Sequence, residues 1–178
     1  GYTFTTYADC DIVKDIKEKH CYVVEDVDKA KQQFNDTQDC ISYEMPDGQV
    51  VTLGSERFQV GEGLFDPKLI GSEERSVIEL VVDTINACPK PLQEEMVSSI
   101  AIVGGSSLLK GLDERFEKCL KKVLPSNLVD VVKIVKVRKD IKHHACMIGA
   151  STISMISLKS LKNNSKPSFG WLDKEQYD

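Results

Sequence analysis

The sequence lacks the features that mark membrane, secreted and zinc-binding proteins. No stretch approaches the roughly 18 consecutive apolar residues of a membrane-spanning helix. The first residues do not show the charged-then-apolar layout of a secretory signal peptide. The six cysteines are irregularly spaced, with no Cys-x-x-Cys pair and no Cys/His ligand pattern. We therefore expect a reduced, intracellular chain with no membrane partner and no metal site.

An excess of positive charge is also missing. Lys and Arg number 23 against 28 Asp and Glu, which gives a net charge of −5. Binding to a phosphate backbone needs a basic surface, so we expect no direct, sequence-specific role on nucleic acid. With 41% hydrophobic and 29% charged residues over 178 positions, the composition instead predicts a globular chain of one domain or a compact pair.

Hydrophobic periodicity predicts alternating helices and strands. Thr6, with Asp9 three residues later, is expected to cap the first helix, and Ser72 to cap a helix that carries Glu73 and Glu74 in its first turn. The segment 25–39 is a solvated helix or a loop, and the helix 147–161 is rich in small and β-branched residues, so it should be buried on more than one side. The predicted elements are helices over 7–21, 72–88, 92–96, 112–124 and 147–161, a hairpin over 42–53, and strands over 98–103 and 129–137. This order indicates an α/β chain.

Two glycines follow the predicted strand 98–103. Gly104 and Gly105 have no side chains, so a flat or charged ligand can approach the backbone. Open α/β sheets bind ligands at this end of their strands. No Gly-Lys-Ser/Thr follows, which excludes a Walker loop. By itself the motif leaves both a ligand site and a purely structural turn open.

A colinear series of motifs closely resembles actin and the actin-related proteins. These motifs occupy residues 1–6, 12–19, 21–23, 43–50, 56–58, 64–67, 102–111, 148–151 and 171–177. They span essentially the whole chain. The resemblance implies a partial actin-like (ribonuclease H-like) ATPase fold, in which a helical subdomain with a hairpin precedes an incomplete α/β sheet.

The resemblance also implies how the chain is divided. Residues 1–71 would correspond to actin subdomain 4 and residues 72–142 to part of subdomain 3. Residues 143–178 would return toward subdomains 1 and 3. We therefore expect a C-terminal fragment of a divergent actin-related protein, without the N-terminal half of the fold. Only two strands follow the hairpin, against a usual sheet of about five or six, so unpaired edges predict self-association.

In the actin family a nucleotide lies in a cleft, and the resemblance carries its ligands to particular positions here. The implied residues are Lys14, Lys17, Glu18, Gly104, Gly105, Ser106, Leu108, Leu109 and His143. Lys17 and Glu18 would approach the adenine and ribose, and Glu18 can accept hydrogen bonds from the ribose hydroxyls. Without the resemblance, the charged residues of the first helix are typical of a solvated helix face.

Several positions depart from the family pattern. Leu108 and Leu109 replace a methionine and a tyrosine that pack on the base, so aromatic packing is lost. His143 falls near a lysine that flanks the base. It can stack but carries less charge at neutral pH, and a histidine with only a structural role is equally consistent. The apolar plug of the filament core is shorter here, at residues 69–72, and extra residues around 162–168 border a partner-binding cleft.

The phosphate-binding Asp-x-Gly loops of the family are missing from the sequence. We therefore expect no ATP hydrolysis by this chain, with ATP or ADP and Mg²⁺ bound only by the intact protein. Expected partners are actin or other actin-family subunits, with complex-specific proteins at the C-terminal cleft. The role would be cytoskeletal or chromatin-associated assembly, in cytoplasm or nucleus. The alternatives are an active ATPase of the actin and heat-shock chaperone superfamily, or an interaction scaffold whose nucleotide site has decayed.

Overall fold

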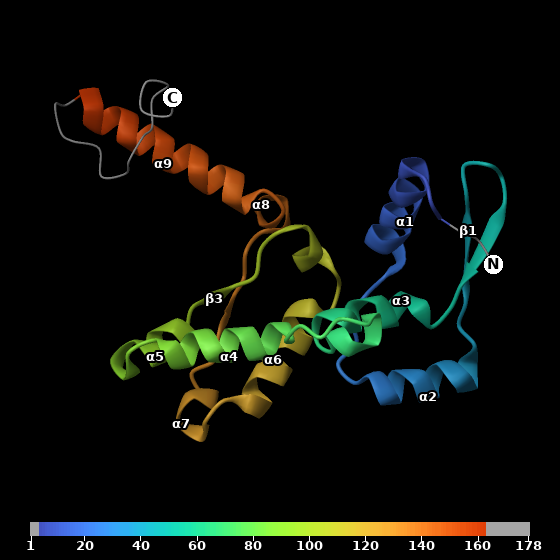
Figure 1. Cartoon of the computed structure of the whole chain (residues 1–178), viewed down its shortest axis with the longest axis horizontal. Coiled ribbons are helices and arrows are strands. Elements are labelled where there is room, and N and C mark those ends of the chain that lie inside the picture. Colours follow the sequence, from blue (N-terminus) through green and yellow to red (C-terminus); the bar gives the residue numbers. More distant parts are fainter. Residues whose placement is uncertain (1–3, 163–178) are drawn as a thin grey trace.

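The computed structural model describes residues 4–162, and side chains up to residue 156. It is a mixed helix and strand fold with two small two-stranded sheets (Figure 1). The first half contains α1 (Tyr7–His20), α2 (Val27–Thr37), β1 (Ile41–Glu44), β2 (Val50–Leu53), α3 (Glu56–Gln59), η1 (Val60–Leu64) and η2 (Pro67–Ile70). The second half contains α4 (Val77–Ala87), α5 (Lys90–Val97), β3 (Ile100–Ala101), η3 (Gly105–Leu108), α6 (Leu112–Val123), α7 (Ser126–Val129), β4 (Ile134–Val135), α8 (Lys139–Lys142) and α9 (Ala145–Lys162). The start of the first motif, the segment 163–168 and the motif 171–177 lie outside the described residues.

The first helix begins where the sequence predicts. Thr6 Oγ1 accepts from the Asp9 backbone N–H at 3.2 Å, and the Asp9 carboxylate accepts in return from the Thr6 N–H at 2.8 Å. This reciprocal pair is a capping box, and the backbone N–H of Thr6 is the main cause that lowers the pKa of Asp9. The segment 25–39 is a helix rather than a loop. Its N-cap is Asp26, and it ends at Gln38 in the left-handed conformation.

The predicted hairpin is confirmed, with β1 and β2 paired antiparallel from Ile41–Leu53 to Glu44–Val50. The tight turn is closed by the Met45 carbonyl, which accepts from the Gly48 N–H at 2.9 Å. Gly48 has a φ of +80°, which a glycine adopts without steric cost. On α3, which follows the hairpin, Phe58 is 2% exposed and its ring contacts those of Tyr22 and Phe34.

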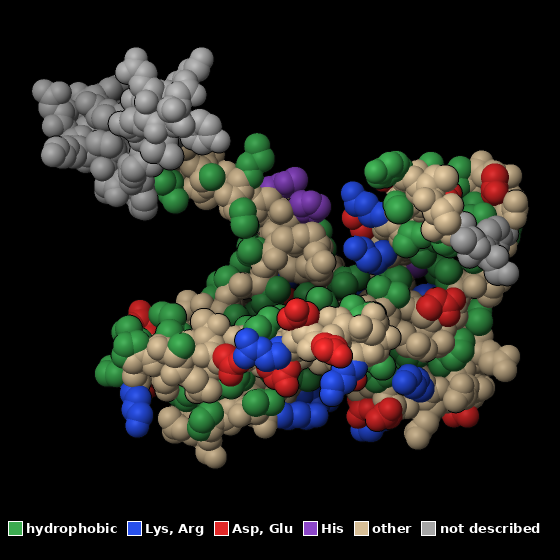
Figure 2. Space-filling view, in the orientation of Figure 1, with side chains coloured by type: hydrophobic (Ala, Val, Ile, Leu, Met, Phe, Trp, Pro, Cys, Tyr) green, Lys and Arg blue, Asp and Glu red, His purple; other side chains and the backbone are tan. Residues whose placement is uncertain are grey.

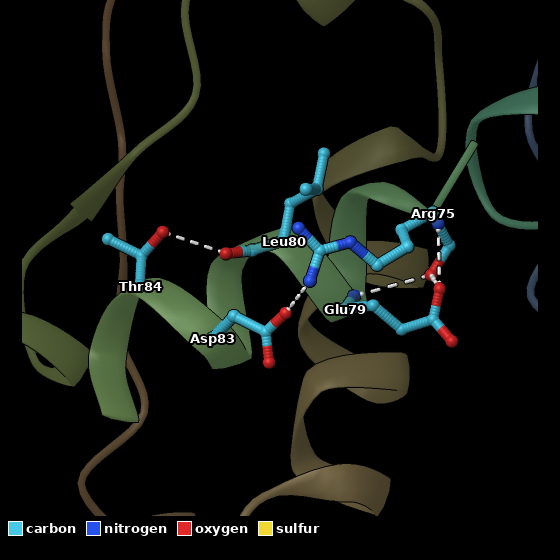
Figure 3. A network of polar contacts seen from close by, with 6 residues as sticks. Arg75, Glu79, Leu80, Asp83 and Thr84 are labelled. Atoms are coloured by element: carbon cyan, nitrogen blue, oxygen red, sulfur yellow. Dashed lines mark hydrogen bonds and ion pairs between the residues drawn. The ribbon is translucent and has the colours of Figure 1, made fainter. Parts of the chain in front are cut away.

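The N-cap of α4 is Ser76, four residues after the predicted cap Ser72. Ser76 Oγ accepts from the Glu79 backbone N–H, and the Glu79 carboxylate accepts from the Ser76 N–H at 2.8 Å. Ser72 Oγ instead accepts from the Glu74 N–H two residues ahead, which stabilises a local turn. Arg75, just before the helix, pairs with Asp83 about two turns along α4 (Figure 3).

The main core lies between α4, α6 and the small parallel sheet. Its buried members are Ile78, Ile85, Val97, Phe116, Leu120, Leu124, Leu128 and Val132. Helix α6 buries Leu112, Phe116 and Leu120, whereas Val123 near its end is 55% exposed.

The strands β3 and β4 are parallel and pair only at Ile100–Ile134 and Ala101–Val135. The predicted strands 98–103 and 129–137 are therefore too long. Pro125 begins a helical turn, in which its carbonyl accepts from the Leu128 N–H at 2.9 Å. The valines that follow reach the core from α7 and a turn, and so they do not extend β4.

The helix α9 projects away from the rest of the molecule (Figure 1). Met147 is 76% exposed and Met155 58%, and Ile148, Ile153 and Ile156 are exposed as well. The prediction that this helix is buried on more than one side is therefore wrong over its described side chains. Its main described neighbour is α8, which meets it end to end and covers no side of it. Within residues 4–162, no helix is long and apolar enough to cross a lipid bilayer.

Candidate functional site

Tyr22 and Val23, the short extended segment that follows α1, join the two halves of the chain; we call this segment the strap. The Val23 backbone N–H donates to the Lys110 carbonyl at 2.8 Å, and Tyr22 and Lys110 form an isolated parallel bridge. Gly111 packs so closely on this strap that a Cβ there would lie 2.1 Å from the Val23 carbonyl oxygen. This junction places α1 opposite η3, the turn that begins at the second of the paired glycines.

One pocket of about 540 Å³ lies between these elements. Its lining residues are Lys14, Lys17 and Glu18 from α1, Gly105, Ser106, Leu108 and Leu109 from η3 and its end, and His143 after α8. Figure 2 shows basic side chains on α1 facing the histidines beside α8 across this hollow. Eight of the nine predicted ligand residues are thus brought together, although more than 120 positions separate the ends of the set.

Gly104 is the predicted residue that does not line the pocket. It has a φ of +98° and is the N-cap of η3, so its backbone helps to form the turn but does not line the pocket. Its carbonyl accepts from the Ser107 backbone N–H at 3.2 Å and from Ser107 Oγ at 2.6 Å. Gly105 faces the pocket, and a Cβ there would lie 3.8 Å from His143 Cε1.

The lining combines three kinds of chemistry. Lys14 and Lys17 supply two cations, and Glu18 supplies carboxylate acceptors. Leu108, at 41% exposure, offers apolar surface to a flat ring. The volume falls within the ~300–1,000 Å³ of small-molecule sites. A ligand with an apolar planar part, hydroxyls and negative charge would match all three.

Polar contacts help to hold the helix that carries the cations, beside a ring contact between His20 and Tyr43. None of its residues is buried. Tyr43 Oη, from the hairpin, donates to Asp15 Oδ2 at 2.9 Å, and Lys19 Nζ bonds to the same carboxylate. Lys19 and then Tyr43 hold the pKa of Asp15 below its usual range. Sequence reasoning missed this support, because Asp15 and Tyr43 are 28 positions apart.

Lys142 and Asp113 are a second supporting pair that sequence reasoning missed. Lys142, the residue before His143, donates hydrogen bonds to Asp113, which lies 29 positions earlier in the sequence. A pair so far apart leaves no local sequence pattern from which it could be predicted. Among side chains 4–156, no group of three or more His, Cys, Asp or Glu residues is arranged to hold a metal ion.

Comparison with known proteins agrees with the motif series. The sequence profile of the actin family matches residues 1–167. The chain is 34% identical over 166 residues to actin-related protein 2 of Schizosaccharomyces pombe, in a match that covers 88% of this chain and 42% of that protein. The chain thus spans less than half the length of this curated relative. The resemblance is confirmed, and the mixed helix and strand structure fits the actin-like ATPase fold that the family implies. The chain belongs to the actin family of actins and actin-related proteins.

Proposed function

We propose that the pocket between α1 and η3 binds an adenine nucleotide, ATP or ADP, and that the protein serves as an actin-related assembly subunit. The observation that carries the proposal is the convergence of Lys14, Lys17 and Glu18 with the glycine turn and His143 around one cavity. Membership of the actin family supports the choice of ligand.

Each lining group has a role in this proposal. Glu18 accepts hydrogen bonds from the ribose hydroxyls, and Lys17 supplies positive charge beside them. Leu108 and Leu109 give the base an apolar contact in place of an aromatic one, so the base loses some stacking energy. Gly105 allows close approach because it has no Cβ, and His143 can stack on the base.

Isothermal titration calorimetry with ADP and ATP tests this binding. Glu18→Ala and Lys17→Ala each remove a charge-assisted hydrogen bond of about 1.5–3 kcal/mol, which corresponds to a roughly 10- to 150-fold weaker Kd. The charge-matched controls are Glu94→Ala and Lys122→Ala, which are exposed positions on α5 and α6. Equal affinities for Glu18→Ala and Glu94→Ala, or no heat from any nucleotide, would contradict the proposal.

We further propose that the 178-residue chain does not turn over ATP. Its sequence has no Asp-x-Gly phosphate loop, and Mg²⁺ would arrive with the nucleotide phosphates rather than on protein ligands. Phosphate release that stops in Glu18→Ala would favour the alternative of an active ATPase.

An interaction scaffold with a decayed nucleotide site is the second candidate. The leucines at 108 and 109 favour it, because they remove the aromatic surface that the family presents to the base. A folded chain that shows no nucleotide heat but still binds actin-family subunits would select this candidate.

The subdomain division and the partners complete the proposal. We assign residues 1–71, in which Phe58 is buried, to actin-like subdomain 4. We assign residues 72–142, in which Phe116 is buried, to part of subdomain 3. For the intact protein we propose that residues 143–178 return toward subdomains 1 and 3. Actin or other actin-family subunits and complex-specific proteins are the proposed partners, in cytoskeleton or chromatin complexes of the cytoplasm or nucleus. The exposed apolar residues of α9 support a binding role, and light scattering of the chain tests self-association.

A further inference from the structure

Lys142 is a buried cation that directly precedes His143, one of the residues lining the pocket. Its side chain is only 7% exposed, and its Nζ donates to both carboxylate oxygens of Asp113, at 2.9 and 2.8 Å. Asp113 lies in the first turn of α6, where the helix dipole favours a negative charge. Its own side chain is 38% exposed, so the carboxylate remains in contact with water.

The backbone of Lys142 is bonded to the glycine turn. Its carbonyl accepts from the Gly104 N–H at 2.8 Å. The next residue, His143, lines the pocket and lies close to Gly105. One residue thus connects the start of α6, the turn before η3 and the histidine that faces the ligand.

The geometry points to a positioning role for the Lys142–Asp113 ion pair, which fixes His143 and the glycine turn in the arrangement that receives the ligand. A helix as short as α8, with four residues, does not hold its own shape in water. The ion pair supplies the anchor, because a buried cation without a partner is strongly unfavourable. For its ligand this inference rests on the proposed nucleotide site, but the placement of His143 can be measured in the free protein.

Three variants separate positioning from folding. Asp113→Asn keeps the size and removes the charge. Lys142→Met removes the buried cation and leaves Asp113 solvated, so no unpaired charge stays in the interior. Asp113→Glu keeps the charge, so the ion pair with Lys142 should still form. Glu117→Gln is the matched control, because it breaks a half-buried ion pair with Lys121 on the same helix, in which neither side chain is as buried as Lys142.

Two readouts are taken at a temperature where circular dichroism shows each variant folded. The first is the chemical shift and pH titration of the His143 imidazole, assigned with His143→Gln. The second is the Kd for ADP. Asp113→Asn and Lys142→Met should move the His143 signal and weaken ADP binding about tenfold, within the usual range of coupling between sites. Asp113→Glu should recover most of both, and Glu117→Gln should change neither.

Unchanged His143 signals in a folded Lys142→Met variant would overturn the inference. The same holds if Asp113→Asn unfolds and Lys142→Met leaves His143 and the Kd as they were. If the unaltered chain binds no ADP but the His143 signal moves in Asp113→Asn, the positioning role stands and the nucleotide proposal fails. A loss of ADP binding in Glu117→Gln equal to that in Asp113→Asn would also count against positioning.

Discussion

Gly111 is the position where a single methyl group should be most disruptive. It has a φ of +85° at the start of α6. An added Cβ would meet the Val23 carbonyl oxygen at 2.1 Å and the Val23 carbonyl carbon at 3.2 Å. Both neighbours are backbone atoms, so no side-chain rotation relieves the overlap. Gly111→Ala must therefore separate the strap from α6.

The cost can be worked from two contributions. A non-glycine residue in the left-handed region costs about 1–2 kcal/mol. Moving Val23 away also breaks its 2.8 Å hydrogen bond to the Lys110 carbonyl, which contributes about 0.5–1.5 kcal/mol. Together they predict that Gly111→Ala lowers the free energy of unfolding by about 1.5–3.5 kcal/mol, a large share of the ~5–15 kcal/mol typical of a domain.

Gly48→Ala is the matched control for the assay. Gly48 has a nearly equal φ of +80°, but nothing lies within 4 Å of its added Cβ. In urea unfolding followed by circular dichroism, Gly48→Ala should show only the left-handed cost of about 1–2 kcal/mol. Equal losses for the two variants would refute the argument, because the backbone overlap at Val23 would then be without effect.

Two further predictions, each with its own control variant, concern a helix cap and a buried charge. Ser76→Ala should destabilise α4 by about 1 kcal/mol in urea unfolding. Hydrogen bonds from Ser76, chiefly its backbone N–H, lower the pKa of Glu79 from its usual 4.5. That stabilisation is therefore complete above pH 4.5 and is lost as pH falls through the lower folded pKa, and Glu79→Gln should flatten this acid limb. Arg115→Met leaves the carboxylate of Glu62, 5% exposed, without its partner and should cost about 3–5 kcal/mol at neutral pH. Burial raises the pKa of Glu62, so this cost should shrink in acid, and Lys118→Met, at an exposed pair, should cost under about 1 kcal/mol. Equal costs for the two Met variants would contradict the burial argument.

Local signals in the sequence predicted the local structure well. The Thr6–Asp9 capping box and the Pro-Asp-Gly turn at 46–48 act over a few residues, so the sequence contains everything that fixes them. The second capping box was equally available, because Ser76 precedes Glu79 by three residues. The glutamates at 73 and 74 favour Ser72 as the cap, but the helix begins after Ser76, so here the reciprocal hydrogen bonds outweigh the dipole preference.

Long-range packing decided what the sequence did not predict. The valines near 129–132 have strand propensity, but Pro125 and the α6 surface place them in a helical turn against the core. The exposure of α9 depends on which elements cover it, and no periodicity within the helix contains that information. The spacing of Lys14 and Glu18 at i and i+4 does predict a common helix face, with Lys17 at its boundary. Their meeting with the glycine turn depends on the Val23–Gly111 junction.

The two walls of the pocket are held by different forces, and this predicts where a ligand acts. The α1 wall has no buried residue and rests on polar contacts such as Tyr43–Asp15. The η3 wall continues into α6, which buries Leu112, Phe116 and Leu120. Regions with few buried apolar contacts open most easily, so a ligand that bridges the walls should mainly stabilise α1. Hydrogen exchange with and without ADP should therefore show slower exchange of the α1 amides, with little change in the middle of α6. Equal slowing in both helices would mean that they open together as one unit, and that α1 does not open more easily than α6.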